Sequence, residues 1–405
     1  MVPVASTVTI GIKIQNFSSR TTMKKLNILS LIALSAAMAA CSSDDVATAD
    51  GMMVEDNSPV LINLTSGAKK TLTRASVESY GANNAFNAEG MGLYMLASDK
   101  TGLNVNALDI DWLDNNYTFW WDNVNGTATA VTDPDGGDDY TKITADVEGY
   151  KAYYPTGDWY KYSFYAYYPR QEENNMSSDS RSVYINIDGT QDIIWGKASS
   201  DDQFGYCARY FRQTAHMTEV PNISMSHKMT RIRFATIAGA DGTGNYDGAL
   251  RMGIRTIKVL QVPTRGYLTV ANLTDPTQEG VLTFDWSEDA DKADLAIKDS
   301  TDAEFTGFAD HRVAMQEKYV GQPILLPVPA ADYVYKVYIE LEDEDGTVFP
   351  TETPLELNFA SQGINFEAGK SYKVVMTIHG PKIIEAKASL TPWEESSDEI
   401  NIDLN

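Results

Sequence analysis

The residue types that most often carry catalysis or bind metals are few and scattered in this chain of 405 residues. The four histidines, His216, His227, His311 and His379, lack the i, i+2 or i, i+4 spacing that gathers metal ligands, and none adjoins Cys207. No G-x-S-x-G, P-loop or dinucleotide-binding motif occurs. The sequence therefore predicts no catalytic residue, no metal site and no cofactor.

Two acidic stretches, DPDGGDD at 133–139 and EDEDG at 342–346, raise the question of calcium binding. A calcium loop needs oxygen ligands at alternating positions, and the first stretch has Pro134 and two glycines there. Acidic turns explain both stretches without a bound ion.

Cys41 is a residue for which the neighbouring sequence does predict covalent chemistry. A lysine pair at 24–25 precedes an apolar run, 26–37, that is too short to span a bilayer comfortably, and the small residues 38–40 lead to the cysteine. This pattern resembles a bacterial lipoprotein signal, in which the cysteine is acylated, for example with palmitate, and becomes the N-terminus. A plain secretory signal with an incidental cysteine is the alternative.

The charge balance argues against two classes of partner. Residues 1–22 carry no export pattern, so we expect translation to start at Met23 and residues 1–40 to be absent from the mature protein. The 32 basic residues then fall by four to 28, against 56 acidic residues, which gives a net charge of −28. Nucleic acid and anionic membrane surfaces are therefore poor partners. With Cys41 acylated, Cys207 has no partner for an intramolecular disulfide.

A short strand is predicted between the cysteine and the body of the chain. Residues 42–58 are polar and acidic, as a flexible tether would be. In VLINLT at 60–65, Val60, Ile62 and Leu64 share one face of an extended segment. The stretch SGAKKTLTRA that follows ends at Arg74-Ala75, where a trypsin-like protease could cut.

The body of the chain shows the pattern of an all-β protein. Apolar residues alternate with other residues in short segments bounded by Gly, Asn, Asp and Pro, and the clearest cases are 161–169, 182–188, 335–346 and 372–380. The best helical candidate, 288–297, is short. This spacing favours antiparallel Greek-key β-sandwiches, with a junction between two halves near 216–224.

Aromatic residues are dense at 117–123 and 159–168. Strands of a sandwich core have this composition. The alternative is an exposed platform that stacks on sugar rings, with Trp120, Trp121 and Trp159 as its candidate residues.

The last seven residues, EINIDLN at 399–405, are predicted to form a strand. Ile400, Ile402 and Leu404 alternate with polar residues. Such a strand can pair within its own sheet or add to the sheet edge of another molecule.

In this order and spacing, several segments together resemble the fimbrillins, which are lipoprotein-exported pilin subunits of the type V kind. They are the signal ending at Cys41, the leader strand before Arg74, FYAYYP at 164–169, SHKMTRIRF at 226–234, and the closing AGKSYKVVMTIHG with KASLTPWEE within 368–395. The resemblance implies two transthyretin-like β-sandwich domains, at 75–220 and 221–405, preceded by the signal region 1–40 and a leader at 41–74.

The resemblance also implies a mechanism of assembly. The lipid would deliver the precursor to the outer membrane, and an arginine-specific protease would cut between Arg74 and Ala75. Val60, Ile62 and Leu64 would be the plug strand that leaves its groove, and Ile400, Ile402 and Leu404 would be the donor strand of the next subunit. The expected partners are other copies of the chain and the anchor and tip pilins of a surface fimbrium used for adhesion, and no motif specifies a host ligand.

Two alternatives remain open at this point. The chain could be the anchor or tip subunit of a fimbrium. It could also be a monomeric, lipid-anchored surface protein that binds glycans through its aromatic residues.

Overall fold

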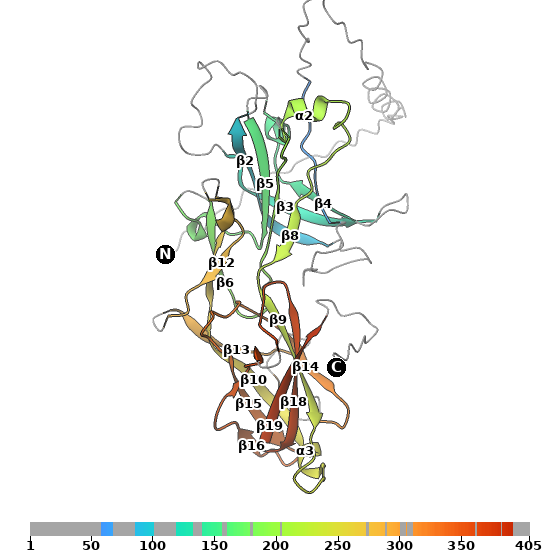
Figure 1. Ribbon diagram of the computed structural model, residues 1–405, viewed down its shortest axis with the longest axis vertical. Helices are drawn as coiled ribbons and strands as arrows, with labels where there is room; N and C mark the ends of the chain where they lie inside the picture. The colour runs from blue at the N-terminus through green and yellow to red at the C-terminus, as the bar shows by residue number, and fades with distance from the viewer. Residues whose placement is uncertain are drawn as a thin grey trace, which may run out of the picture. The chain divides into compact units, whose positions relative to one another are not determined.

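The structure is a computed structural model, and it describes residues 58–67, 86–100, 119–132, 140–155, 160–178, 181–202, 205–272, 275–287, 290–299, 305, 311–360, 363–381 and 383–391. All of them belong to one compact unit, Asn57–Asn405. The fold is mostly β (Figure 1), as the alternating segments predict.

A seven-stranded sheet forms first along the chain, in the order β1-β4-β3-β2-β5-β7-β8. Each strand pairs with its neighbours in antiparallel fashion. Its strands are β1 (Leu64–Ser66), β2 (Ala88–Lys100), β3 (Phe119–Val131), β4 (Tyr140–Ala145), β5 (Tyr160–Tyr168), β7 (Ile194–Ala198) and β8 (Ser224–His227). The predicted strand at 161–169 is therefore confirmed as β5.

The two edges of this sheet meet through a backbone bridge. Thr65 of β1 forms a parallel bridge with Asn222, just before β8 begins at the other edge. The sheet is therefore almost closed into a barrel, and β1 completes the closure.

Strand β5 is buried on both faces, which explains why its sequence is aromatic on both faces. Phe164 and Ala166 point into one buried cluster, inside the near-barrel, whereas Tyr165 and Tyr167 belong to a second cluster on the other face. All four are fully buried. The favoured prediction, that this aromatic stretch is core, is confirmed for β5.

A three-stranded sheet covers the second cluster. Its order is β12-β11-β6, with β6 (Ser182–Asn186), β11 (Arg265–Thr269) and β12 (Leu282–Phe284). Val183, Ile185 and Leu268 on its inner face join Tyr165 and Tyr167 in the cluster. The β6–β11 pairing thus links segments about 80 residues apart in sequence.

Two further sheets share the third and largest cluster. One has the order β13-β10-β15-β16, with β17 also on β15, and the other has the order β14-β9-β18-β19. Their strands are β9 (Thr230–Ala238), β10 (Met252–Pro263), β13 (Lys292–Ala296), β14 (Lys318–Leu326), β15 (Lys336–Asp343), β16 (Val348–Pro350), β17 (Leu355–Glu356), β18 (Ser371–Gly380) and β19 (Ile383–Thr391). In the predicted strand at 335–346, Tyr335 just before β15 and Val337, Ile339 and Leu341 within it alternate along the chain and are all fully buried.

Two expectations about this region are wrong. The pair β9–β18 is parallel, so its sheet is mixed rather than antiparallel; the long chain between the two strands permits the crossover that a parallel pair requires. The helix expected within 288–297 is instead strand β13, which pairs with β10. Leu295 and Ile297 are buried and lie two residues apart, as on one face of a strand. The segment is too short to form a stable helix on its own, so burial of this face against the rest of the fold determines its conformation.

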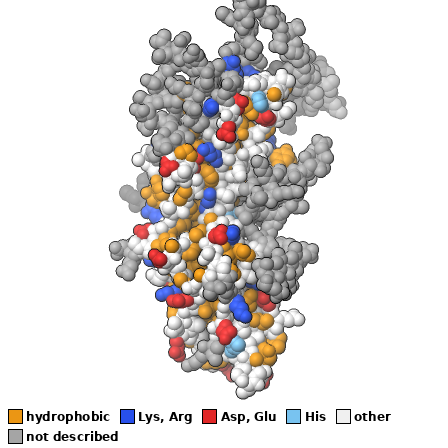
Figure 2. Space-filling view, viewed as in Figure 1, with side chains coloured by type: hydrophobic (Ala, Val, Ile, Leu, Met, Phe, Trp, Pro, Cys, Tyr) orange, Lys and Arg blue, Asp and Glu red, His pale blue; other side chains and the backbone are white. Residues whose placement is uncertain are grey.

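Helical structure is confined to short pieces within the part that the structure describes. They are the α-helices α2 (Ala208–Arg212) and α3 (Asp247–Leu250) and the 3-10 helices η1 (Gly149–Ala152), η2 (Glu173–Asn175) and η3 (Pro276–Gln278). None of these described helices is long and apolar enough to span a membrane. Figure 2 shows acidic and basic side chains scattered among each other over the described part of the visible face.

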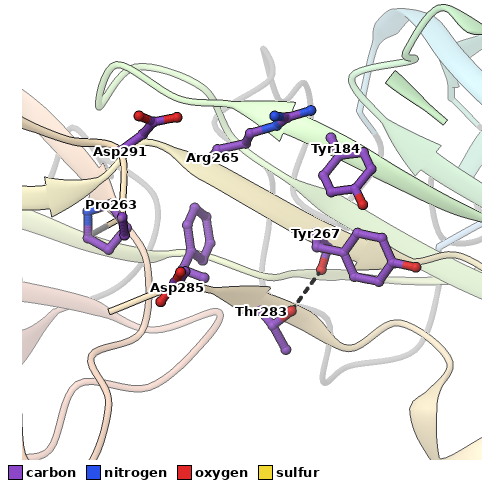
Figure 3. Close-up of a pocket in the computed structure, with 9 residues that line it drawn as sticks. Tyr184, Pro263, Arg265, Tyr267, Thr283, Asp285 and Asp291 are labelled. Carbon is purple, nitrogen blue, oxygen red and sulfur yellow. Dashed lines mark hydrogen bonds between the residues drawn. The ribbon is translucent and has the colours of Figure 1, made fainter. Parts of the chain in front are cut away.

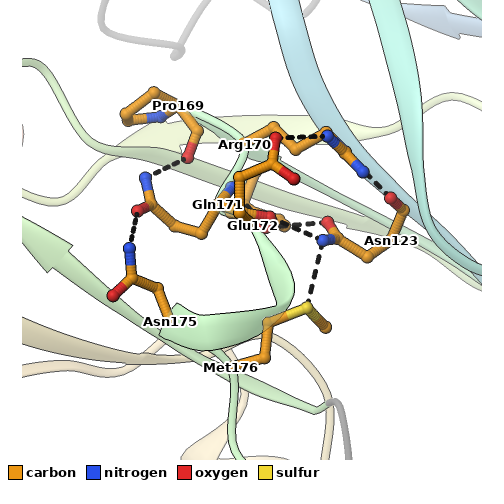
Figure 4. Close-up of polar contacts among 8 residues, drawn as sticks. Asn123, Pro169, Arg170, Gln171, Glu172, Asn175 and Met176 are labelled. Carbon is orange, nitrogen blue, oxygen red and sulfur yellow. Dashed lines mark hydrogen bonds and ion pairs between the residues drawn. The ribbon is translucent and has the colours of Figure 1, made fainter.

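Asn123 ties strand β3 to the loop after β5 (Figure 4). Its side-chain amide donates to the carbonyl oxygen of Gln171 at 2.8 Å and contacts the sulfur of Met176, while its Oδ1 accepts from the Tyr167 hydroxyl at 2.8 Å. Arg170 donates to the Asn123 carbonyl at 2.9 Å. Asn123 is buried and has a φ of 47°, a conformation that asparagine tolerates better than most residues.

Candidate functional site: the leader strand and its groove

The structure describes one of the four predicted functional features, the plug strand. Val60, Ile62 and Leu64 lie within the described residues. Cys41, the Arg74-Ala75 bond and the terminal residues Ile400, Ile402 and Leu404 lie outside them, so their predicted roles remain predictions. We call residues 58–67 the leader segment.

The leader segment presents one aliphatic face to the interior. Leu64 is buried, and Val60 and Ile62 are half-buried against the cluster inside the near-barrel. Between them, Leu61 is 50% exposed. The alternation predicted from VLINLT is therefore confirmed.

Hydrogen bonds hold the leader segment on the side of β4 and η1. Leu64, Thr65 and Ser66 pair with residues 143, 142 and 141 of β4, respectively, in antiparallel register. Nearer the start of the leader segment, the Ile62 amide donates to the Ala152 carbonyl at 3.0 Å, and the Tyr154 amide donates to the Val60 carbonyl at 2.9 Å. This side alone would make the leader an ordinary edge strand.

The opposite side of the leader segment is also hydrogen-bonded. The Thr65 amide donates to the Pro221 carbonyl at 3.0 Å, and the Ile223 amide donates to the Thr65 carbonyl at 2.7 Å. The Asn222 side chain donates to the Gly67 carbonyl at 3.1 Å. The leader segment therefore lies between two parts of the chain and fills a slot in the wall of the near-barrel.

Arg212, at the end of α2, holds the start of the leader segment. Its Nε and Nη2 donate to the Ser58 carbonyl at 3.1 and 2.9 Å. This contact has no local signal in the sequence, because Arg212 lies 154 residues from Ser58. The stretch 216–224, expected as a junction between halves, supplies the second wall of the slot.

Three polar side chains, Tyr210, His216 and Glu219, form a cluster beside the slot. The Tyr210 hydroxyl donates to Glu219 at 2.5 Å, and His216 stacks on the Tyr210 ring and contacts Glu219 at 3.0 Å. The hydrogen bond from Tyr210 holds the pKa of the Glu219 carboxyl below its usual value, and His216 adds to the effect. The cluster thus favours an ionised Glu219 beside the leader.

The slot is not completely filled by the leader segment. A cavity of about 210 Å³ remains there, and it is lined by Val60, Leu61, Asn63, Tyr154, Phe211, Met217, Glu219 and Pro221. Several of these are apolar residues that a bulkier strand could contact. Open space therefore remains beside Val60, Leu61 and Asn63 of the leader segment.

Chemically, the site is a strand-binding groove. Its interactions with the leader segment are backbone hydrogen bonds and apolar burial, for which any extended strand with aliphatic residues at alternate positions is a suitable ligand. Each buried aliphatic side chain contributes ~1.5–3 kcal/mol when fully buried, and the half-buried Val60 and Ile62 contribute less.

The other sites considered from sequence give a clear result where the structure describes them. Trp121 is 2% exposed, so it cannot serve as a sugar platform, and Lys151 lies 4.2 Å from the ring centroid of the half-buried Trp120. Trp159 lies outside the described residues. In EDEDG, Asp343 accepts hydrogen bonds from the amides of Asp345 and Thr347, which is an acidic turn. The described residues contain no group of His, Cys, Asp and Glu suited to a metal ion.

Comparison with known proteins shows what the chain is similar to. A sequence profile of the fimbrillin-like family matches residues 73–393. No curated protein matches the chain. Among solved structures, a candidate cell adhesion protein from Bacteroides uniformis is 19% identical, with 83% of this chain and 99% of that chain covered and a TM-score of 0.46.

Two solved structures of fimbrial proteins also match. The fimbrial anchor protein Mfa2 from Porphyromonas gingivalis is 8% identical, with 83% of this chain and 98% of that chain covered and a TM-score of 0.31. A fimbrial protein from Bacteroides ovatus is 12% identical, with 80% of this chain and 50% of that chain covered and a TM-score of 0.29. The family match extends over most of the chain, and on that basis the chain belongs to the fimbrillin-like family of fimbrial and adhesion proteins, which are not enzymes.

Proposed function

We propose that the chain is a structural subunit of a surface fimbrium that polymerises by strand exchange. It is exported as a precursor acylated at Cys41, delivered to the outer membrane, and cut between Arg74 and Ala75 by an arginine-specific protease. The leader segment then leaves its slot, and a strand of the next subunit takes its place. The resulting fibre displays the subunits at the cell surface for adhesion.

The observation that carries this proposal is the slot itself. The leader segment is hydrogen-bonded on both sides and completes the near-barrel, yet the proposed cut would separate it from the rest of the chain. After the cut, only non-covalent contacts would hold it. The family profile matches from residue 73, next to the proposed cut after Arg74.

The proposed donor strand has the pattern that the slot requires. Ile400, Ile402 and Leu404 repeat the i, i+2, i+4 spacing of Val60, Ile62 and Leu64. A strand with this spacing can place three aliphatic side chains on one face while its backbone pairs on both sides. Matched in order, Ile400 is larger than Val60 by one methylene group, while Ile402 and Leu404 are the same residue types as Ile62 and Leu64.

An in vitro cleavage experiment tests the proposal. The full chain with Cys41→Ser, which removes the lipid acceptor, is treated with an arginine-specific protease and followed by size-exclusion chromatography and electrophoresis without heating. We expect cleavage after Arg74 and a ladder of polymers. An Arg74→Ala variant should stay intact at this bond and remain monomeric.

Variants of the terminal strand separate cleavage from exchange. Ile402→Asp should be cut normally but fail to polymerise, because a carboxylate cannot enter an apolar slot without a large penalty. Asn401→Asp, on the opposite face of the same strand, is the matched control and should still polymerise. A cut chain that stays monomeric, or polymers that form equally from Arg74→Ala, would contradict the mechanism and favour an anchor or a tethered binding protein.

A further inference from the structure

The outer face of the three-stranded sheet carries an open pocket of about 600 Å³ (Figure 3). Tyr184, Tyr267 and Thr283 are direct cross-strand neighbours on β6, β11 and β12. Their strand neighbours Val183, Ile185 and Leu268 point inward and are fully buried. The register therefore places two tyrosines and a threonine in one row facing solvent.

The two tyrosines form an aromatic floor at one end of the pocket. Their ring centroids are 5.0 Å apart and the rings are tilted by 54°. The Arg265 guanidinium lies 4.5 Å from the Tyr184 ring centroid, and the Thr283 hydroxyl contacts the Tyr267 carbonyl at 3.4 Å. Among the described residues, neither tyrosine hydroxyl has a hydrogen-bond partner, so both can bond to a ligand.

Charged groups surround this floor. Figure 3 shows Arg265 and Asp291 on one side of the opening and Thr283 and Asp285 on the other. The backbone amide and the hydroxyl of Ser287 donate to the Asp285 carboxylate and hold its pKa below the usual value. A carboxylate can only accept hydrogen bonds. Asp285 and Asp291 therefore favour a ligand with several hydrogen-bond donors.

We propose that this pocket binds a neutral saccharide. A sugar ring offers an apolar face for the tyrosines and hydroxyls that donate to Asp285 and Asp291 and accept from Arg265. One arginine against two aspartates leaves the pocket with a net negative charge, and the whole chain carries −24. Sialylated or sulfated glycans are therefore disfavoured.

The pocket is independent of the strand-exchange groove. Its lining residues lie on β6, β11 and β12 and at 263, 285 and 290–291, and none of them lines the slot of the leader segment. Saccharide binding is a function separate from the proposed assembly, and it names the class of ligand that this pocket would contribute to adhesion. It should occur whether or not the leader has been removed.

A glycan microarray with neutral, amino and acidic oligosaccharides tests the proposal, using the full chain with Cys41→Ser before and after protease treatment. We expect binding to neutral glycans in both states. Tyr184→Ala and Tyr267→Ala should each weaken binding by about tenfold. Tyr319→Ala is the matched control, since Tyr319 is another partly exposed strand tyrosine with an arginine, Arg233, 3.8 Å from its ring centroid.

Substitutions of exposed carboxylates guard against misfolding of the tyrosine variants. Asp285→Asn and Asp291→Asn should retain the thermal unfolding midpoint and weaken binding, because an amide accepts fewer hydrogen bonds. Unchanged binding in the tyrosine variants, or in both aspartate variants, would overturn the proposal. So would binding restricted to acidic glycans, or no binding to any neutral glycan on the array. Loss of polymerisation with binding intact would count against the assembly mechanism alone.

Discussion

The Ile223 amide donates a 2.7 Å hydrogen bond to the carbonyl oxygen of Thr65, joining residues 158 positions apart. The bond links the leader segment to the chain just before β8, at the far edge of the seven-stranded sheet. The leader segment is thus the piece that closes the near-barrel.

Truncation of Leu64 should loosen the leader segment. Leu64 is 3% exposed in the cluster inside the near-barrel, so Leu64→Ala removes buried methyl groups at a cost of about 2–5 kcal/mol. We expect faster hydrogen exchange at the amides of Thr65 and Ile223. Leu61→Ala, at a 50% exposed position on the same strand, is the control and should leave both rates nearly unchanged. Equal effects of the two variants would contradict the burial pattern.

Removal of the Arg212 side chain should free the start of the leader segment. Arg212→Ala loses both hydrogen bonds to the Ser58 carbonyl, and Arg212→Lys cannot reproduce the two-donor fork. We expect both variants to speed proteolysis near residue 58 while the global free energy of unfolding changes by less than about 1 kcal/mol. Arg251→Ala, at a surface ion pair with Glu344, is the comparison and should not alter proteolysis there.

Asn123 should be costly to replace. Asn123→Ala leaves the buried Tyr167 hydroxyl and the Gln171 carbonyl without their shared partner, and alanine disfavours a positive φ. We expect a loss of about 2–3 kcal/mol in urea unfolding. Asn125→Ala, at an exposed position two residues along β3, should change the free energy by less than about 0.5 kcal/mol. Similar losses for both would show that the network contributes little.

Buried tyrosines should make the fold sensitive to alkali. Burial raises the pKa of Tyr167 from its ordinary 10.0 to about 12, and burial also raises the pKa of Tyr94 and Tyr165. Between the unfolded and folded pKa values the folded state binds more protons, so stability is lost as pH rises above about 10. Circular dichroism and tyrosinate absorbance, followed together from pH 9 to 13, should show ionisation of these tyrosines accompanying unfolding. Their ionisation without loss of structure would contradict the assignment of burial.

Local alternation was enough to predict several elements of this fold. The strands β6, β15 and β18 follow from residues of alternating polarity, β5 follows from its aromatic run that stops at a proline, and the inward face of VLINLT follows from a period of two. Strand β13 was missed because its burial depends on β10, which lies about 30 residues earlier in the chain. The parallel pairing of β9 with β18 likewise has no local signature.

The candidate site was predictable only in part. Val60, Ile62 and Leu64 were identified from the sequence, but the walls of their slot come from β4 and 221–223, which only the fold brings together. Tyr184 and Tyr267 were not singled out because their proximity arises from the register between β6 and β11. The domain boundary after residue 220 and the transthyretin-like topology stay predictions.

The N-terminal residue and intact mass of the protein released from the surface of its native cells test the central claim most directly. The strand-exchange account predicts a chain that begins at Ala75, carries no lipid and migrates as ladders of polymers that dissociate on heating. A chain that begins at acylated Cys41 and migrates as a monomer would contradict it, because the leader segment would then still occupy its slot.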